Sequence, residues 1–332
     1  MHKRPSDMTP RGKKAMKRAI AAHVTGDLGA AEAGYREAAA AGDSDAAYQL
    51  GWVLQDRGDY VGAATAFEQA AHAGNLDATG PLANLFADCL GRPDDAIKLY
   101  SEASARGDST ALLNLGLLQA EQGNLSEAEA AFLEAAKAGN PDAHRELGEL
   151  YAESGRQEEA LLSLSRATEL AVPDSWSWLG LVLFRLGRLD EAETALLRAV
   201  EAGEPDAHRL LGDLFHTLLR LDDAERSYIN AIERGDLGAY LEYGDLLDDW
   251  GGRELEAVAA YERALEQGEE AAHLELAKLY HGLRNVVAAE REYRAALTGG
   301  DERARPGLNS LLAETGRATE VADEEESPPA GT

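Results

Sequence analysis

The chain has 332 residues, of which 45% are hydrophobic, and its 32 Lys and Arg against 60 Asp and Glu give a formal net charge of −28. This acidity argues against sequence-independent nucleic-acid binding, which requires a basic surface that neutralises phosphates. The single cysteine excludes a disulfide framework and any zinc site with several thiolate ligands, and it is compatible with a reducing cytoplasm.

The first residues carry charge of the opposite sign. Residues 1–18 hold seven Lys and Arg against one Asp, a net +6 that leaves −34 for the remainder. The next stretch contains His23, Asp27 and Glu32, so it is too polar for an export signal, and no later run is long enough to span a membrane. We therefore expect a flexible basic arm over residues 1–11 and a cytoplasmic location.

From residue 12 onward the sequence repeats itself every 32 or 33 residues. An aromatic residue or a leucine marks each unit, and an alanine stands four residues before it and three residues after it in all nine units. The markers are Tyr35, Phe67, Tyr100, Phe132, Leu164, Leu196, Tyr228, Tyr261 and Tyr293. A fixed period of this size predicts a stacked array. The estimate of two domains that chain length alone would suggest is therefore set aside.

Each unit contains two apolar stripes with helical spacing and no strand pattern. Ala143, Leu147, Leu150 and Tyr151 form the first stripe of one unit. Glycine lies between the two stripes, as at Gly155, and a second glycine closes most units, where a left-handed residue commonly ends a helix. The pattern predicts two antiparallel helices per unit.

Short motifs within the units resemble a known family. W-x-x-L-G occurs at residues 176–180, H-x-x-L-G-x-x-Y at 144–151 and A-x-x-x-F at 63–67 and 128–132. These motifs resemble tetratricopeptide repeats, although the units are shorter than the family's period of about 34 residues. The closing A-x-x-x-G, as at 135–139, resembles Sel-like repeats.

The resemblance implies a fold and a class of function. It implies an all-α fold, a right-handed α-solenoid of about nine antiparallel helix pairs with a partial C-terminal capping unit, over residues 12–316. Such arrays mostly serve as binding scaffolds, so we expect a non-enzymatic adaptor that binds a peptide segment or a partner helix in its concave groove.

In this family the first helix of each pair lines the groove. The corresponding candidates here are Tyr48, Trp52, Gln55, Asn84, Leu113, Asn114, Leu117, Arg145, Glu149, Phe184, Arg185, Arg209, Asp213, His216, Asp245, Asp248, Lys278 and His281. The Lys and Asn pairs of the family's carboxylate clamp are missing, because their positions read Tyr48/Trp52, Gly80/Asn84 and Leu113/Leu117. An acidic chaperone tail is therefore not an expected partner.

The expected groove is apolar in its first half and acidic in its second. Trp52 is the strongest apolar anchor, whereas Asp213, Glu242, Asp245, Asp248 and Asp249 would attract cations. This combination predicts a protein or peptide partner with basic and apolar residues. The alternative interpretation is that the apolar residues belong to the core and the acids are ordinary solvated surface.

No motif for catalysis, cofactor or metal binding is present. His144, His208 and His273 recur in one repeat column, and successive helices lie about 10 Å apart, too far for one metal ion with bonds of about 2 Å. The chain has no phosphate-binding glycine loop, H-E-x-x-H or G-x-S-x-G motif. Cys89 is expected to be a small buried hydrophobe.

The C-terminal end differs from the repeats. We expect Pro306 and Gly307 to interrupt the first helix of a partial unit, and residues 317–332 to form a short helix and a disordered acidic tail. Three further hypotheses remain open: self-assembly through the ends or edges of the array, contact of residues 1–18 with an acidic groove in the same molecule or in a neighbour, and a regulatory array whose basic arm contacts nucleic acid. High use of Arg and Ala with few Lys indicates a bacterial source.

Overall fold

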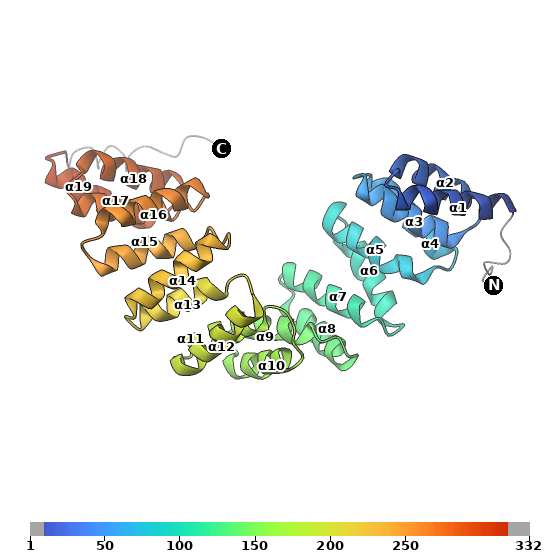
Figure 1. The fold of residues 1–332 in the computed structure, drawn as a ribbon, viewed down its shortest axis with the longest axis horizontal. Coiled ribbons are helices and arrows are strands. Elements are labelled where there is room, and N and C mark those ends of the chain that lie inside the picture. Colours follow the sequence, from blue (N-terminus) through green and yellow to red (C-terminus); the bar gives the residue numbers. More distant parts are fainter. Residues whose placement is uncertain (1–9, 318–332) are drawn as a thin grey trace. The chain divides into compact units, whose positions relative to one another are not determined.

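The protein is described by a computed structural model that covers residues 10–317. The first nine residues of the expected basic arm, and nearly all of the expected C-terminal helix and tail, lie outside this range. Within it the regular elements are helices and no strand occurs, which confirms the all-α repeat array (Figure 1). The helices group into two units, the first ending at Leu170 and the second beginning at Ala171.

In the first unit, helices pair in sequence order as α1–α2, α3–α4, α5–α6, α7–α8 and α9–α10. Their bounds are α1 Pro10–Val24, α2 Leu28–Ala40, α3 Ser44–Asp56, α4 Tyr60–His72, η2 Leu76–Ala78, α5 Thr79–Asn84, η3 Leu85–Cys89, α6 Pro93–Ser104, α7 Ser109–Glu121, α8 Leu125–Lys137, α9 Ala143–Glu153 and α10 Gln157–Glu169. Here η2 is a 3₁₀ turn and η3 is a π-helical turn.

The second unit continues the same alternation and ends on an unpaired first helix within the described range. Its elements are α11 Ser175–Arg185, α12 Leu189–Ala202, α13 Ala207–Thr217, α14 Leu221–Glu233, α15 Ala239–Trp250, α16 Glu254–Glu266, α17 Ala272–Gly282, α18 Val286–Thr298, η4 Glu302–Ala304 and α19 Arg305–Glu314. None of the helices over residues 10–317 is long and apolar enough to cross a membrane.

The alanine column predicted from the repeat forms the centre of the core. The alanines that precede the marker residues are Ala31, Ala63, Ala96, Ala128, Ala160, Ala192, Ala224, Ala257 and Ala289, and all have no exposed surface. Small side chains at this position let the two helices of a pair lie close together. The marker aromatic and leucine side chains are also buried, with at most 4% of their surface exposed.

A second set of small residues, in the first helix of each pair, lies directly beneath the marker side chains. Gly212 lies in α13 directly under the ring of Tyr228 in α14, and a Cβ added there would lie 2.5 Å from Tyr228 Cε1. Gly51 under Phe67 shows the same arrangement, as does Gly244 under Tyr261. Each of these glycines therefore lets the ring pack directly on the backbone of its partner helix.

The glycines expected to end helices adopt the left-handed conformation. Gly58, with φ +76°, does so between the helices of a pair, and Gly139, with φ +90°, does so after a second helix. Ala171 stands at the corresponding joint and has φ +55°, a conformation that costs an L-residue with a Cβ about 1–2 kcal/mol. Leu219 also has positive φ, in the turn between α13 and α14.

Arginines in the turns between paired helices tie each pair to the previous one. Arg156 precedes α10, pairs with Glu129 of α8 at 2.7 Å and with Glu159 of its own helix at 2.6 Å, and lies over the Tyr151 ring. Arg220 and Arg253 repeat this arrangement in the second unit, with Glu193 and Glu225. We call this contact the arginine staple.

Two expectations about local structure are wrong. Cys89 is exposed, because the third pair replaces a regular first helix with η2, α5 and the π-turn η3, at whose end Cys89 lies. Pro306 and Gly307 do not interrupt a helix. Pro306 stands in the first turn of α19, where a missing N–H is tolerated, and Gly307 packs under the Tyr293 ring.

Candidate functional site

The first helices of the second unit place carboxylates at the base of a surface hollow. Tyr228 passes over Gly212, and its hydroxyl donates a 2.8 Å hydrogen bond to Asp213, the next residue along α13. The following pair repeats this arrangement, with the Tyr261 hydroxyl donating to Asp245 at 2.8 Å. A Gly-Asp dipeptide in the first helix and a tyrosine in the second thus fix each carboxylate at the same position.

Four first helices contribute side chains to this hollow, which we call the acidic pocket. It has a volume of about 540 Å³ and is lined by Phe184, Asp213, His216, Thr217, Tyr228, Glu242, Asp245, Asp248, Asp249, Tyr261 and Glu275. Six of the lining residues are acidic, and neither Lys nor Arg lines it. Phe184 belongs to α11, at one end of the series, and the acids follow on α13, α15 and α17.

Burial of these carboxylates disfavours their charged form. Burial raises the pKa of Asp213 above its ordinary value, opposed by the hydrogen bond from Tyr228. Burial likewise raises the pKa values of Glu242 and Asp245, each helped by neighbouring acids. Glu242 Oε2 is shielded from solvent and has no hydrogen-bond partner among the described residues. A cation entering the pocket would relieve this repulsion.

Partial neutralisation comes from the rim of the acidic pocket. His216 Nε2 lies 3.1 Å from Asp249, and Lys278 pairs with Glu275 at 2.8 Å. Arg209 attracts Asp213 and Glu242 electrostatically, but its guanidinium bonds to Asp236 at 3.2 Å. Asp245 and Asp248 have no ion-pair partner among the described residues, so the pocket keeps a negative charge.

The expected groove residues in the second unit fall into three groups. Phe184, Asp213, His216, Asp245 and Asp248 meet in the acidic pocket. Lys278 and His281 line a separate hollow with Tyr293 and Glu314, while Arg209 is half-buried and Arg185 is exposed. Glu275, Tyr228 and Tyr261 also line the acidic pocket, although groove alignment alone does not select them.

The apolar side chains of the first unit that were expected to contact a partner instead pack against other residues of the fold. Tyr48 and Trp52 pack against Phe67, with ring centroids 5.8 Å and 5.4 Å from it. Leu113 is buried in α7, whereas Gln55 and Leu117 are half-buried. These positions agree better with a core role for the aromatic pair and for Leu113 than with a free apolar groove.

The polar candidates of the first unit bond to one another. Asn84 accepts hydrogen bonds from Tyr100 at 2.6 Å and from Asn114 at 3.2 Å, and both asparagines line a second hollow of about 430 Å³. Arg145 lies between Glu149 and the buried Glu146. The hollow around the two asparagines is of mixed charge, because Asp77, Arg106 and Asp108 also line it.

The described residues contain no group of three His, Cys, Asp or Glu side chains able to hold a metal ion. The repeated histidines instead pack individually, and burial lowers the pKa values of His144 and His208. His273 bonds to the buried Glu292 at 2.7 Å. These histidines therefore do not come together in a shared metal site within the described residues.

Comparison with known proteins supports the repeat assignment. Family models described as tetratricopeptide repeat match residues 44–69, 90–143, 145–207 and 179–240. No curated protein matches the chain.

Solved structures show the same fold at low sequence identity. A Sel1 repeat protein from Oxalobacter formigenes superposes with a TM-score of 0.61 and 22% identity, over 90% of this chain and 93% of that one. The protective antigen c5321 of uropathogenic Escherichia coli, described as an SLR fold, gives 0.58 and 22%, over 89% and 72%. PilF of Pseudomonas aeruginosa gives 0.52 and 20%, over 62% and 97%.

Repeat folds of this kind generally mediate protein–protein interactions, and their families are typically non-catalytic. The family models, the Sel1-type structural neighbours and the helix pairs described above agree with one another. The chain therefore belongs to the tetratricopeptide repeat family, and it shares its fold with Sel1 repeat structures.

Proposed function

We propose that the chain is a non-enzymatic scaffold that binds a protein segment carrying basic and apolar side chains in the acidic pocket. The observation that carries this proposal is the set of six carboxylates in one hollow with no Lys or Arg on its lining. Nucleic acid does not fit this surface, because its phosphates would be repelled. We also propose a cytoplasmic location, which cell fractionation would test.

The layout of the acidic pocket defines the segment that fits. Asp213 and Asp245 lie on successive first helices, which pack about 10 Å apart. Two basic side chains separated by two helical turns would span this distance. Phe184 at the α11 end offers an aromatic surface for an apolar side chain or for the stem of a lysine. We therefore expect a helix or extended segment with two basic residues and one apolar residue.

Calorimetric titration with a synthetic peptide tests the proposal. The probe is an alanine-based peptide with two lysines seven residues apart and a leucine beyond them, and its control replaces both lysines with glutamate. The full chain should bind the first peptide and not the second. Binding should weaken as salt rises from about 50 mM to about 200 mM, because exposed charges are screened.

Charge reversal at the exposed rim identifies the binding surface. Asp248→Lys/Asp249→Lys should weaken peptide binding at least about tenfold, which corresponds to about 1.4 kcal/mol. The matched control is Asp222→Lys/Glu233→Lys, which makes the same charge change on exposed positions of α14. Equal affinity in the two variants would show that net charge, and not the acidic pocket, attracts the peptide.

A further inference from the structure

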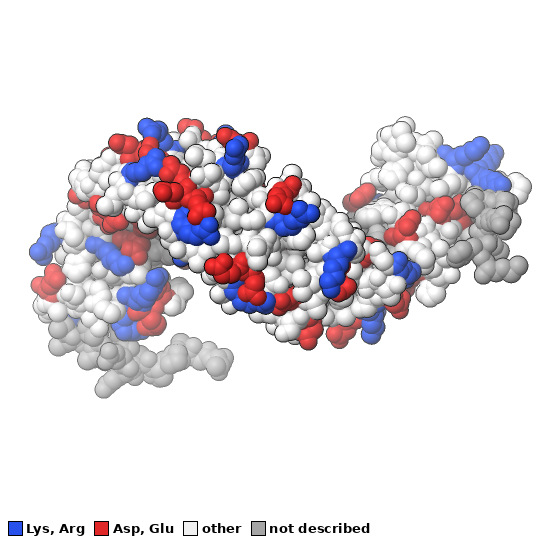
Figure 2. Space-filling view, turned by 90° about the horizontal axis from the view of Figure 1, so that it is seen from below, with Lys and Arg blue, Asp and Glu red and all other residues white. Residues whose placement is uncertain are grey.

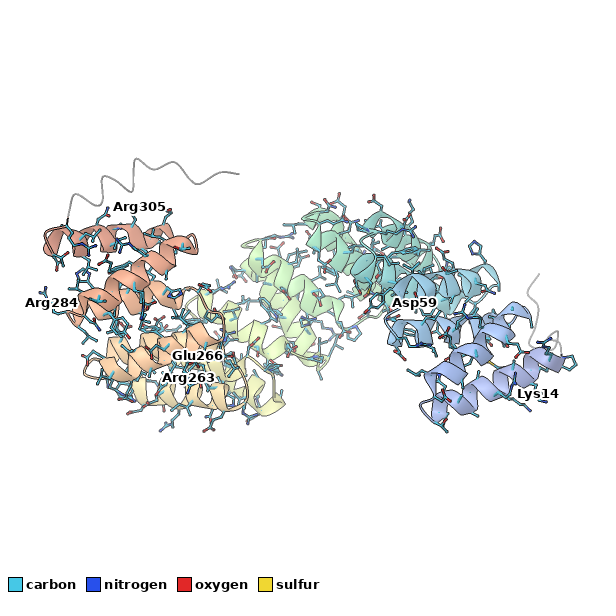
Figure 3. All side chains as sticks on the ribbon, turned by 90° about the horizontal axis from the view of Figure 1, so that it is seen from above. Lys14, Asp59, Arg263, Glu266, Arg284 and Arg305 are labelled. Carbon is cyan, nitrogen blue, oxygen red and sulfur yellow. The ribbon has the colours of Figure 1, made fainter. Side chains whose placement is uncertain are left out.

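The first helix of the array carries a basic face that no described residue neutralises. Lys13, Lys14 and Lys17 are exposed on α1, and none forms an ion pair with another described residue. Figure 3 labels Lys14 on this helix, and Figure 2 shows Lys and Arg side chains gathered beside the N-terminal end of the described chain. The arginines of α1 behave differently, since Arg11 and Arg18 both pair with Glu37 of α2.

The same face of α1 becomes apolar toward its C-terminal end. Lys13, Lys17, Ile20 and Val24 follow one another at spacings of four, three and four residues, so they form one stripe along the helix. Ile20 is 46% exposed and Val24 is 83% exposed. Ala15 and Ala19 are buried on the other side of α1, which turns the basic and apolar stripe outward.

The stripe matches the acidic pocket in chemistry and in order. With a rise of about 1.5 Å per residue, Lys17 lies about 10 Å from Val24 along the helix, and Lys13 lies about 16 Å from it. The pocket begins with Phe184 on α11, and acids follow on α13 and α15, each helix about 10 Å from the last. With Val24 on Phe184, Lys17 would lie beside α13, and Lys13, about 6 Å further along the helix, would reach α15 through its long, flexible side chain.

We propose that α1 of one copy docks in the acidic pocket of a second copy, so that the chain assembles head to tail. This inference rests on the proposed function, since it names a second copy of the chain as the basic and apolar partner. Helix-in-groove docking of this kind uses apolar anchors on one helix face, here flanked by complementary charge. Because the two surfaces differ, each end stays available for another copy.

Trans-complementation between full-length variants tests the proposal. One variant carries Lys13→Glu/Lys14→Glu/Lys17→Glu, and the other carries Asp248→Lys/Asp249→Lys. All five positions are exposed, so circular dichroism should show intact helices in both. Sedimentation velocity at about 50 mM salt should show concentration-dependent assembly of the wild type. Each variant alone should be monomeric, because its two surfaces now carry like charge.

Mixing the two variants should restore assembly, since the unaltered α1 of the second meets the unaltered acidic pocket of the first. The Asp222→Lys/Glu233→Lys variant should assemble like the wild type. A wild-type chain that stays monomeric at every concentration, or assembly that both interface variants retain, would overturn the inference. Continued binding of the lysine peptide by a monomeric chain would leave the proposed function standing, whereas loss of both would refute both.

Discussion

Replacing Gly212 with alanine perturbs the contact that places the acidic pocket. The added Cβ would lie 2.5 Å from Tyr228 Cε1, whereas carbon atoms in contact are normally separated by about 3.5–4.0 Å. The ring must therefore shift by about 1 Å. Tyr228 is only 1% exposed and its hydroxyl is bonded to Asp213, so a shift disturbs both the packing and that hydrogen bond.

The expected free-energy change combines three contributions. Overpacking of this size costs about 1–3 kcal/mol, and weakening a buried hydrogen bond costs about 1 kcal/mol more. Alanine favours the helix over glycine by about 1 kcal/mol. We therefore expect Gly212→Ala to destabilise the second unit by about 2 kcal/mol and to weaken peptide binding, because Asp213 loses its position.

Gly282→Ala in α17 is the matched control. No atom lies within 4 Å of the Cβ that it would add, so it should stabilise the chain by up to about 1 kcal/mol. Urea unfolding followed by circular dichroism measures both variants, with separate midpoints for the two units if their transitions separate. If Gly212→Ala proves as stable as Gly282→Ala, the proposed ring-on-glycine packing is wrong.

Three further predictions concern other positions. Ala171→Gly should raise stability by about 1 kcal/mol in the same urea assay, because it relieves a left-handed alanine, and a loss of stability would contradict this. Asp245→Asn and Glu129→Gln should have opposite effects on the pH dependence of unfolding. Burial raises the folded pKa of Asp245, so the protonated carboxyl favours the folded state at low pH and this stabilisation is lost as pH rises. The Asn variant should therefore gain stability relative to the wild type toward neutral pH. Arg156 lowers the pKa of Glu129, so the Gln variant should lose about 1 kcal/mol at neutral pH and recover as the wild-type carboxyl is protonated at low pH. Cys89 should react with a thiol reagent in the folded chain as fast as in urea, and strong protection would refute its exposure.

The period of the sequence was sufficient to predict the helix pairs, their buried alanines and their left-handed caps. These features depend on residues close together in the chain, or on a column repeated in all nine units. The grouping of Asp213, Asp245 and Asp248 was also predictable, because a fixed repeat places equivalent residues on neighbouring helices.

Contacts between residues at two different positions of the repeat were harder to predict. Three of the five tyrosine markers, Tyr100, Tyr228 and Tyr261, donate to an amide or acid that follows a small residue of the first helix, but these hydrogen bonds become clear only when the helices are paired. The arginine staple likewise joins residues 27 or 28 apart, as in Arg156 with Glu129 and Arg253 with Glu225. The exposure of Cys89 depends on η3, a local departure from the repeat.

The arginine staple also affects how a charged molecule approaches the array. Arg156, Arg220 and Arg253 each lie against two carboxylates, and pairs such as Arg263 with Glu266 on α16 compensate charge locally (Figure 3). Much of the positive charge therefore forms short-range dipoles whose fields decay quickly, while carboxylates without a partner dominate at longer range. A basic ligand should consequently meet the array at a rate that falls steeply with ionic strength, while its dissociation rate changes little.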